Sequence, residues 1–100
     1  MAVGSPDYFP RYITSAQSSE QLKIDVTDAD SSANFTQACL SILVYNDGAN
    51  AVHFNEDAAA TTDHFIIPAK SWLTIDIPVT TPHFICALAE TATVFVLGVY

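Results

Sequence analysis

The sequence has few positive charges and no long apolar run, and each shortage excludes a class of protein. Lysine and arginine together number three against eleven aspartates and glutamates, so the formal net charge is −8. We therefore expect neither nucleic acid nor an anionic membrane as a partner, because phosphates need cationic side chains for neutralisation. No apolar run approaches the ~20 residues that a membrane-spanning helix requires.

Glycine is also scarce, and the common catalytic motifs are missing. With three glycines in the chain, a glycine-rich phosphate loop cannot be built, and a Gly-x-Ser-x-Gly nucleophile elbow is absent. Asp76 has the most apolar sequence neighbours of any carboxylate, but strand alternation turns it away from Ile75 and Ile77. We therefore expect no catalytic residues and no cofactor, and predict that the protein is not an enzyme.

Only two cysteines are present, Cys39 and Cys86, and each lies inside an apolar run. Free cysteine behaves as a small buried hydrophobe. The N-terminal sequence has neither the basic nor the apolar region of a secretory signal peptide, so nothing indicates an oxidising compartment. We expect two buried free thiols rather than a disulfide.

Alternation of apolar and polar residues is the dominant pattern from Leu22 onward. Half of the chain is hydrophobic, which is enough for a core, and no helical spacing persists beyond about two turns. Turn residues separate the alternating stretches at short intervals, as in β-sandwiches. Seven strands are predicted, at residues 22–27, 36–45, 51–55, 65–67, 71–77, 83–89 and 93–100.

The predicted fold is all-β: a single β-sandwich, jelly-roll or immunoglobulin-like, of about seven strands. Residues 22–100 form the sandwich, and residues 1–21, which keep no strand or helix period, form an extended N-terminal arm. Asp47-Gly48 separates two apolar stretches and is a strong hairpin signal. We therefore expect residues 36–45 and 51–55 to pair as a hairpin.

The arm carries a cluster of aromatic and charged residues, and this cluster is a candidate partner-binding site. Its members are Tyr8, Phe9, Arg11 and Tyr12. Exposed aromatic clusters favour contact with a partner. Packing of the arm on its own domain and docking on a neighbouring subunit or partner both remain open from the sequence.

Trp72 is the fifth candidate partner-binding residue. Alternation places it on the same strand face as Thr74 and Asp76, opposite Leu73. An outward tryptophan is an interface anchor, a platform for sugar stacking, or a residue covered by another part of its own chain. We favour coverage or a subunit interface, because sugar sites combine aromatic rings with several fixed polar groups.

Histidines and acidic loops provide weaker candidates. His53, His64 and His83 each precede a phenylalanine and lack the spacing of a metal site, so we expect surface or interface histidines and no metal. Asp28 and Asp30 could supply oxygen ligands, but the sequence lacks the twelve-residue calcium-binding loop. Whether the acidic loops bind a cation is therefore left open by the sequence.

Several segments between residues 40 and 100 resemble small virion structural proteins of tailed bacteriophages. A strand leads through Asn46-Asp-Gly48 into a second strand, and a loop of small residues follows. A Pro-Ala-x-Ser connection then precedes a third alternating strand, although Lys70 stands where such proteins usually have glycine. The segments are residues 42–55, 58–62, 67–75 and 92–96.

This resemblance implies a capsid decoration (cement) protein that binds and stabilises a phage capsid. The implied partner is the major capsid protein or another virion protein, and the implied location is the virion, after synthesis in the host cytoplasm. It also implies a homo-oligomer, for which we favour a trimer. The alternatives are a head/tail connector or fibre accessory protein, and a carbohydrate-binding module that uses Trp72.

Overall fold

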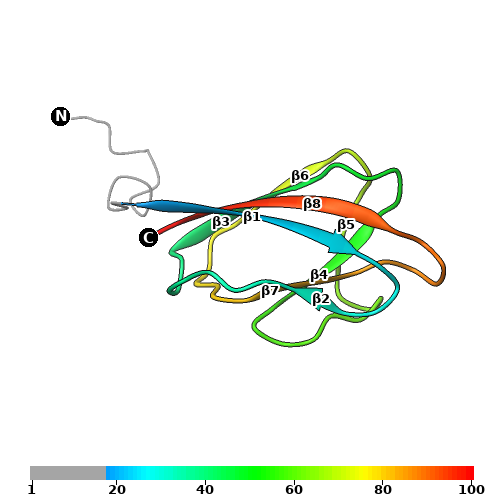
Figure 1. The fold of residues 1–100 in the computed structure, drawn as a ribbon, viewed down its shortest axis with the longest axis horizontal. Helices are drawn as coiled ribbons and strands as arrows, with labels where there is room; N and C mark the ends of the chain where they lie inside the picture. The colour runs from blue at the N-terminus through cyan, green and yellow to red at the C-terminus, as the bar shows by residue number, and fades with distance from the viewer. Residues whose placement is uncertain (1–17) are drawn as a thin grey trace.

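The computed structural model describes residues 18–100, which fold into eight strands in two four-stranded antiparallel sheets (Figure 1). The predicted all-β sandwich is confirmed. The strands are β1 (Ser19–Val26), β2 (Ser31–Ser32), β3 (Ser41–Asn46), β4 (Val52–Glu56), β5 (Phe65–Ile67), β6 (Trp72–Ile75), β7 (Pro82–Ile85) and β8 (Ala92–Val99).

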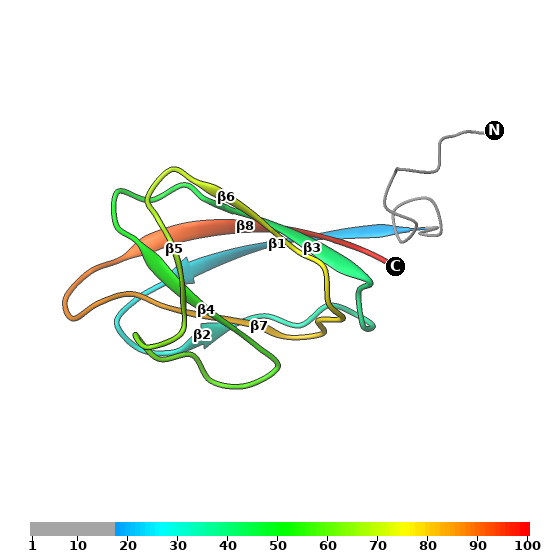
Figure 2. The same cartoon turned by 180° about the vertical axis from the view of Figure 1, so that it is seen from behind.

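The strand order identifies the sandwich as a jelly roll rather than an immunoglobulin fold. Sheet A has the order β1-β8-β3-β6 and sheet B the order β2-β7-β4-β5. The antiparallel pairs β1–β8, β2–β7, β3–β6 and β4–β5 describe one long hairpin, with β4 and β5 at its tip, wrapped into two layers. Figures 1 and 2 show these layers from opposite sides, with the start of β1 beside the C-terminus.

The core lies between the sheets and follows the alternation of the sequence. Every second residue of β8 is buried, and the inward residues of β1 are partly buried at its start and buried at Ile24 and Val26. The rings of Phe54 and Phe84, whose centroids are 5.4 Å apart, pack side by side in sheet B. The apolar side chains of the central strands that are most deeply buried include Ile42, Val44, Val52, Phe84, Val94 and Val96.

The strand predictions need correction in four places. The stretches predicted at 36–45 and 83–89 are strands only over Ser41–Asn46 and Pro82–Ile85. β1 begins at Ser19, inside the segment predicted as arm, because Ser19 to Gln21 continue the pairing with β8. The eighth strand, β2, lies in the predicted polar loop after β1 and pairs with β7. At two residues it is too short to show any periodicity, so only its neighbour in space defines it.

The predicted hairpin at Asp47-Gly48 is wrong. β3 pairs with β6 and β8 in sheet A, whereas β4 pairs with β5 and β7 in sheet B. Gly48 does not have the positive φ of a hairpin turn. It is needed for space instead, since a Cβ at position 48 would lie 2.5 Å from the Cβ of Ala92.

Asn46 directs the chain from one sheet to the other. Its side chain is fully buried, and its Nδ2 lies 2.9 Å from the carbonyl oxygen of Asn50 and 3.2 Å from those of Ile67 and Pro68. Its Oδ1 accepts the N–H of Gly48 at 2.9 Å. These bonds replace the strand pairing that a hairpin would have provided.

The loop before β6 carries the residue that departs from the phage pattern. Lys70 has a φ of 58°, in the left-handed region where glycine is usual. Its Nζ donates to the carbonyl oxygen of Asp47 at 2.7 Å and lies 3.3 Å from the Asp47 carboxylate. The side chain therefore links the β5–β6 loop to the β3–β4 connection.

Both cysteines are buried free thiols, as predicted. Burial, with a smaller contribution from Glu20, raises the pKa of Cys39 to about 11. Burial also raises the pKa of Cys86, with smaller contributions from Glu90 and Asp28. Both thiols therefore stay protonated near neutral pH, which disfavours nucleophilic chemistry.

Candidate protein-interaction face

The outer face of sheet A is the candidate site, and strand register arranges it in rows. Lys23, Phe95, Tyr45 and Trp72 lie side by side across the four strands. The next row is Gln21, Leu97, Leu43 and Thr74, and a third contains Ser19, Val99 and Ser41. The two central strands, β8 and β3, thus carry apolar side chains in most positions of a face that points away from the core.

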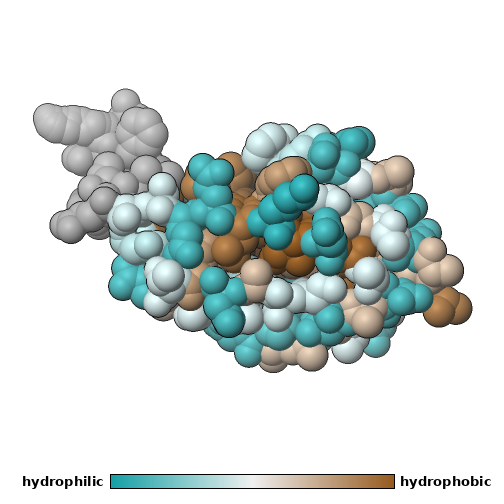
Figure 3. All heavy atoms as spheres, viewed as in Figure 1, coloured by the Kyte–Doolittle hydropathy of each residue, from teal (hydrophilic) through white to brown (hydrophobic). Residues whose placement is uncertain are grey.

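We call this surface the aromatic face and define it as Leu43, Tyr45, Trp72, Phe95, Leu97 and Val99. Trp72 is 64% exposed and Phe95 is 43% exposed, while the other four residues are partly buried. The rings of Tyr45 and Trp72 pack with centroids 4.4 Å apart and planes inclined by 34°. In Figure 3, apolar side chains reach the surface where β1 and β8 run, interrupted by polar side chains.

Polar residues border the aromatic face on both sides. Gln21 and Lys23 of β1 lie along one edge and Thr74 of β6 along the other. Carboxylates mark two corners, where Asp76 accepts the hydroxyl of Ser41 at 3.1 Å and Asp25 accepts that of Thr93 at 3.3 Å. An apolar centre with a polar rim is the usual anatomy of a protein–protein interface.

Two adjoining hollows indent the aromatic face. One, of about 380 Å³, lies at the aromatic row, and the other, of about 300 Å³, lies nearer the C-terminal end of β8. Leu43 and Leu97 line both. Gln21 borders the first, and Ser41 and Thr74 border the second, so each hollow combines apolar walls with hydrogen-bonding groups.

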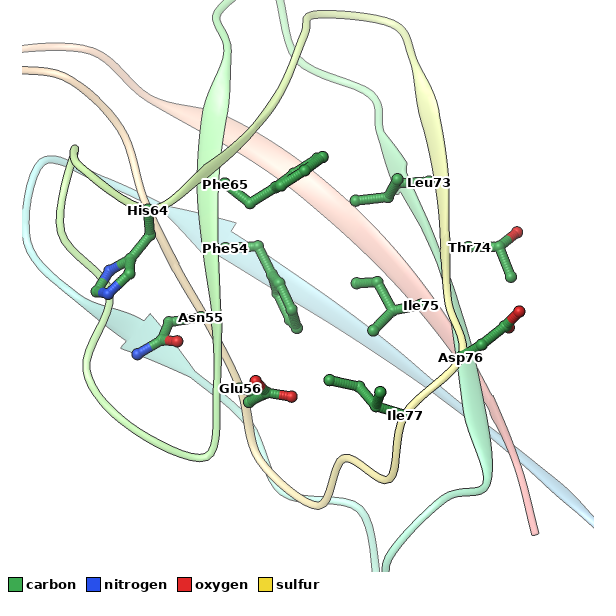
Figure 4. A pocket seen from close by; sticks show the side chains of 10 residues that line it. All are labelled: Phe54, Asn55, Glu56, His64, Phe65, Leu73, Thr74, Ile75, Asp76 and Ile77. Atoms are coloured by element: carbon green, nitrogen blue, oxygen red, sulfur yellow. The ribbon is translucent and has the colours of Figure 1, made fainter.

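A separate apolar groove of about 400 Å³ opens between β5 and β6, the adjacent edge strands of the two sheets. Figure 4 shows Phe54 and Phe65 on one side, with Leu73, Ile75 and Ile77 facing them from the other. Thr74 and Asp76 point away from it, as do Asn55 and His64 on the opposite wall. The groove is therefore an extension of the core to the surface, with Glu56 at one end.

The histidines serve structure in the part of the chain described here. His53 Nδ1 lies 2.9 Å from the carbonyl oxygen of His64, and His64 Nδ1 accepts the N–H of Thr61 at 2.8 Å. His53 and His83 project from the outer side of sheet B, whereas His64 lies just before β5. Within residues 18–100, no three histidine, cysteine or acidic side chains gather as a metal site would require.

Asp28 and Asp57 are loop aspartates that bind backbone amides. Asp28 accepts the N–H of Ala89 at 2.9 Å, and Asp57 accepts those of Thr80 and Thr81 at 3.0 and 2.7 Å. These carboxylates each fasten a loop to a distant part of the chain. The acidic side chains that the sequence offered as cation ligands thus have a structural use.

Asp30 connects three segments at the end of sheet B. Its Oδ1 accepts the N–H of Ala60 at 2.8 Å, and its Oδ2 lies 2.9 Å from His83 Nδ1. Burial by itself would raise the pKa of Asp30, but the hydrogen bonds from Ala60 and His83 and the charge of His83 outweigh it. The net effect is a pKa below the ordinary value of 3.8.

Of the five predicted partner-binding residues, the structure describes Trp72. Its outward orientation agrees with the prediction, and it lies at the edge of the aromatic face. Tyr8, Phe9, Arg11 and Tyr12 lie outside the described residues. Sequence reasoning missed the neighbours of Trp72 because they lie on β3 and β8, whose register with β6 the sequence does not show. Their only sequence signal is the apolar outward positions of two strands.

Comparison with known proteins adds little to this description. No family model matches the chain, and no curated protein matches it in sequence. A search of solved structures finds the crystal structure of PirA, with 6% sequence identity, a TM-score of 0.41, and coverage of 82% of this chain and 93% of that one. A likeness this weak supports no conclusion about function. Residues 18–100 contain no helix that could span a membrane.

Proposed function

We propose that this protein is a non-enzymatic virion structural protein that binds a phage capsid as a decoration (cement) protein and assembles there as a homo-oligomer. The observation that carries the proposal is the aromatic face, an apolar surface with a polar rim on a small acidic sandwich. A monomeric domain gains nothing from exposing Trp72 and Phe95 to water, whereas an assembling protein buries such residues against a partner.

Two further features support this role. The jelly roll is an architecture used by viral capsid domains, although a fold by itself does not specify a function. The sequence segments that resemble small phage virion proteins include β3, β4 and β6, and two of these strands contribute to the aromatic face.

The proposal is tested by immunogold electron microscopy of purified phage particles from the source of this sequence, with antibody raised against the recombinant chain. Label spread over the heads is the expected result. Label confined to the tail or the neck would replace decoration with the connector or fibre accessory role. Particles without label would overturn a virion function.

A second candidate, a carbohydrate-binding module, is favoured by one observation: the packed rings of Tyr45 and Trp72 present an exposed aromatic surface. A glycan array probed with the wild-type protein and with Trp72→Ala tests it. Binding that is lost in Trp72→Ala would support this function, and an array without signal would exclude the glycans tested.

A further inference from the structure

We infer that the aromatic face of one copy binds the N-terminal segment of a second copy, with Tyr8 and Tyr12 seated in its two hollows. The inference rests on the proposed assembly role and identifies the partner of the aromatic face. The occupant is residues 1–17 of another molecule of the same chain, and three observations on the described residues support this choice.

The first observation is where the segment joins the domain. Ser18 and Tyr100 exchange backbone hydrogen bonds of 2.8 and 2.9 Å, beside Val99 at one end of the aromatic face. Residues 11–18 contain no glycine, proline, asparagine or aspartate, and among the common turn residues they have only Ser15 and Ser18. A segment that continues the direction of β1 would reach a second molecule rather than its own face. The ten residues from Ser18 back to Tyr8 can span roughly 35 Å when extended, which reaches a neighbouring molecule.

The second observation is the extent of the two hollows along β8. They adjoin and share Leu43 and Leu97, and their outer walls, Phe95 in one and Val99 in the other, are four positions apart. Tyr8 and Tyr12 are also four positions apart. In an extended backbone, residues at this spacing project on the same side and lie roughly 13 Å apart. One segment laid along β8 can therefore place a tyrosine ring at each hollow.

The polar groups at the hollows suit tyrosine in particular. A tyrosine ring buried against apolar walls still needs a hydrogen-bond partner for its hydroxyl. Gln21 supplies one at the first hollow, and Ser41 and Thr74 supply others at the second. A phenylalanine has no hydroxyl, so in the same position it would give Gln21, Ser41 and Thr74 no new hydrogen-bond partner.

The third observation is charge. The segment from residue 1 to 17 contains one acidic side chain, Asp7, and one basic one, Arg11, so the described domain carries the whole formal charge of −8. Two such domains repel each other when their faces meet directly. A neutral segment avoids this repulsion, and Arg11 brings a positive charge to a face with Asp25 and Asp76 near its corners. Charge therefore favours the segment over a second domain as occupant.

The test uses Trp72 as a reporter, because it is the only tryptophan in the chain and lies on the aromatic face. Light scattering and acrylamide quenching of fluorescence are measured on the full-length wild type, on the double variant Tyr8→Ala/Tyr12→Ala, and on the control Val3→Ala. We expect an oligomer with shielded Trp72 for the wild type and the control. The double variant should lose association by at least about tenfold, with Trp72 open to quencher.

A mixing experiment distinguishes docking on a second copy from docking on the same copy. The double variant, which keeps Trp72 but lacks the two tyrosines, is titrated with full-length Trp72→Phe, which keeps the tyrosines but emits no tryptophan fluorescence. We expect the added chain to restore shielding of Trp72, since only its segment can occupy the face. Val3→Ala combined with Trp72→Phe should restore it equally well.

Three results would overturn the inference. The first is a double variant that has the same mass and the same quenching as the wild type. The second is a wild type that is monomeric and has a shielded Trp72, with no change on mixing. The third is a wild type whose Trp72 stays fully open to the quencher up to roughly millimolar protein concentration. If one of these three results is found but phage heads are gold-labelled, the inference is wrong and the proposed function is still supported. Restored shielding without labelled heads would support the inference and remove the virion role.

Discussion

Asn46 is the most deeply buried polar side chain of the domain described here, and it acts on the backbone. Its amide lies within hydrogen-bond distance of three carbonyl oxygens, and its own oxygen accepts the N–H of Gly48. These bonds join the end of β3, the β3–β4 connection and the end of β5. A single residue thus fixes the point where the chain crosses between the sheets.

Asn46→Ala should therefore lower the free energy of unfolding by about 2–4 kcal/mol, because it leaves buried backbone groups without partners. The matched control is Asn50→Ala, which removes one partly exposed bond to Thr91 and should cost about 0.5–1.5 kcal/mol. Urea unfolding followed by circular dichroism measures both. Equal losses in the two variants would show that Asn46 does not hold the crossing.

Asp30 makes stability depend on acid pH, because its pKa in the folded protein lies below the ordinary 3.8. The sign follows from linkage: a lowered folded pKa stabilises the fold above the unfolded pKa, and this stabilisation is lost as pH falls through the folded value. Asp30→Asn should be less stable than wild type near pH 6, and the difference should shrink as pH falls below 3.8. Urea midpoints of the two proteins across this range measure it, with Asp63→Asn as an exposed control. If the difference between the urea midpoints of wild type and Asp30→Asn stays constant as the pH falls below 3.8, Asp30 is not the group that causes the pH dependence.

At the scale of elements, β6 shows how neighbouring residues of one strand have opposite environments. Leu73 and Ile75 face the core and the groove, while Trp72 and Thr74 face outward. The strand is an edge strand of sheet A, paired with β3 alone among the described strands. Its inner side chains close the sandwich, and its outer ones belong to or border the aromatic face.

Leu73→Asp should unfold the domain, whereas Thr74→Asp should change its stability by no more than about 0.5 kcal/mol. The first places an unpaired charge against the core, which costs several kcal/mol, and the second places it in solvent. Thermal unfolding of dilute protein followed by circular dichroism compares them. Equal tolerance of the two charges would mean that the faces of β6 are inverted.

At the scale of the whole molecule, the jelly roll uses both ends of its chain in one strand pair. β1 and β8 align along their full eight residues, and Ser18 and Tyr100 extend the pairing by one more. The interior of the sandwich is built from residues 22–100, with the inner side chains of both sheets packed in one cluster. Residues 18–100 by themselves form both sheets and one continuous core cluster.

Deletion of residues 1–17 should leave the far-UV circular dichroism of a β protein and a melting temperature within a few degrees of wild type, since residues 18–100 form both sheets and a continuous core cluster. The truncated chain should be monomeric by light scattering, because its aromatic face has lost its occupant. A longer deletion that ends within β1, such as that of residues 1–22, should leave a markedly less stable domain because it removes strand pairing with β8. A truncated 18–100 domain that fails to fold would show that residues 1–17 contribute to the core.

The sequence by itself determined the features that depend on near neighbours along the chain. Alternation in β1, β6 and β8 identified strands and the side each residue occupies, because successive side chains of a strand point to opposite faces. It therefore placed Trp72 and Asp76 outward, and the apolar surroundings of the cysteines predicted buried free thiols. The all-β class and the sandwich follow from the same local pattern.

Only the tertiary structure decided which strands are neighbours. Asp47-Gly48 predicted a hairpin, but the buried side chain of Asn46 and the close approach of Gly48 to Ala92 send β3 and β4 into different sheets. The aromatic face has the same origin. Its six residues come from β3, β6 and β8, and only strand pairing across long sequence separations brings Tyr45 beside Trp72 and Phe95. Side-chain direction is local because it is a property of one strand's geometry, whereas the composition of a surface depends on register between strands distant in sequence.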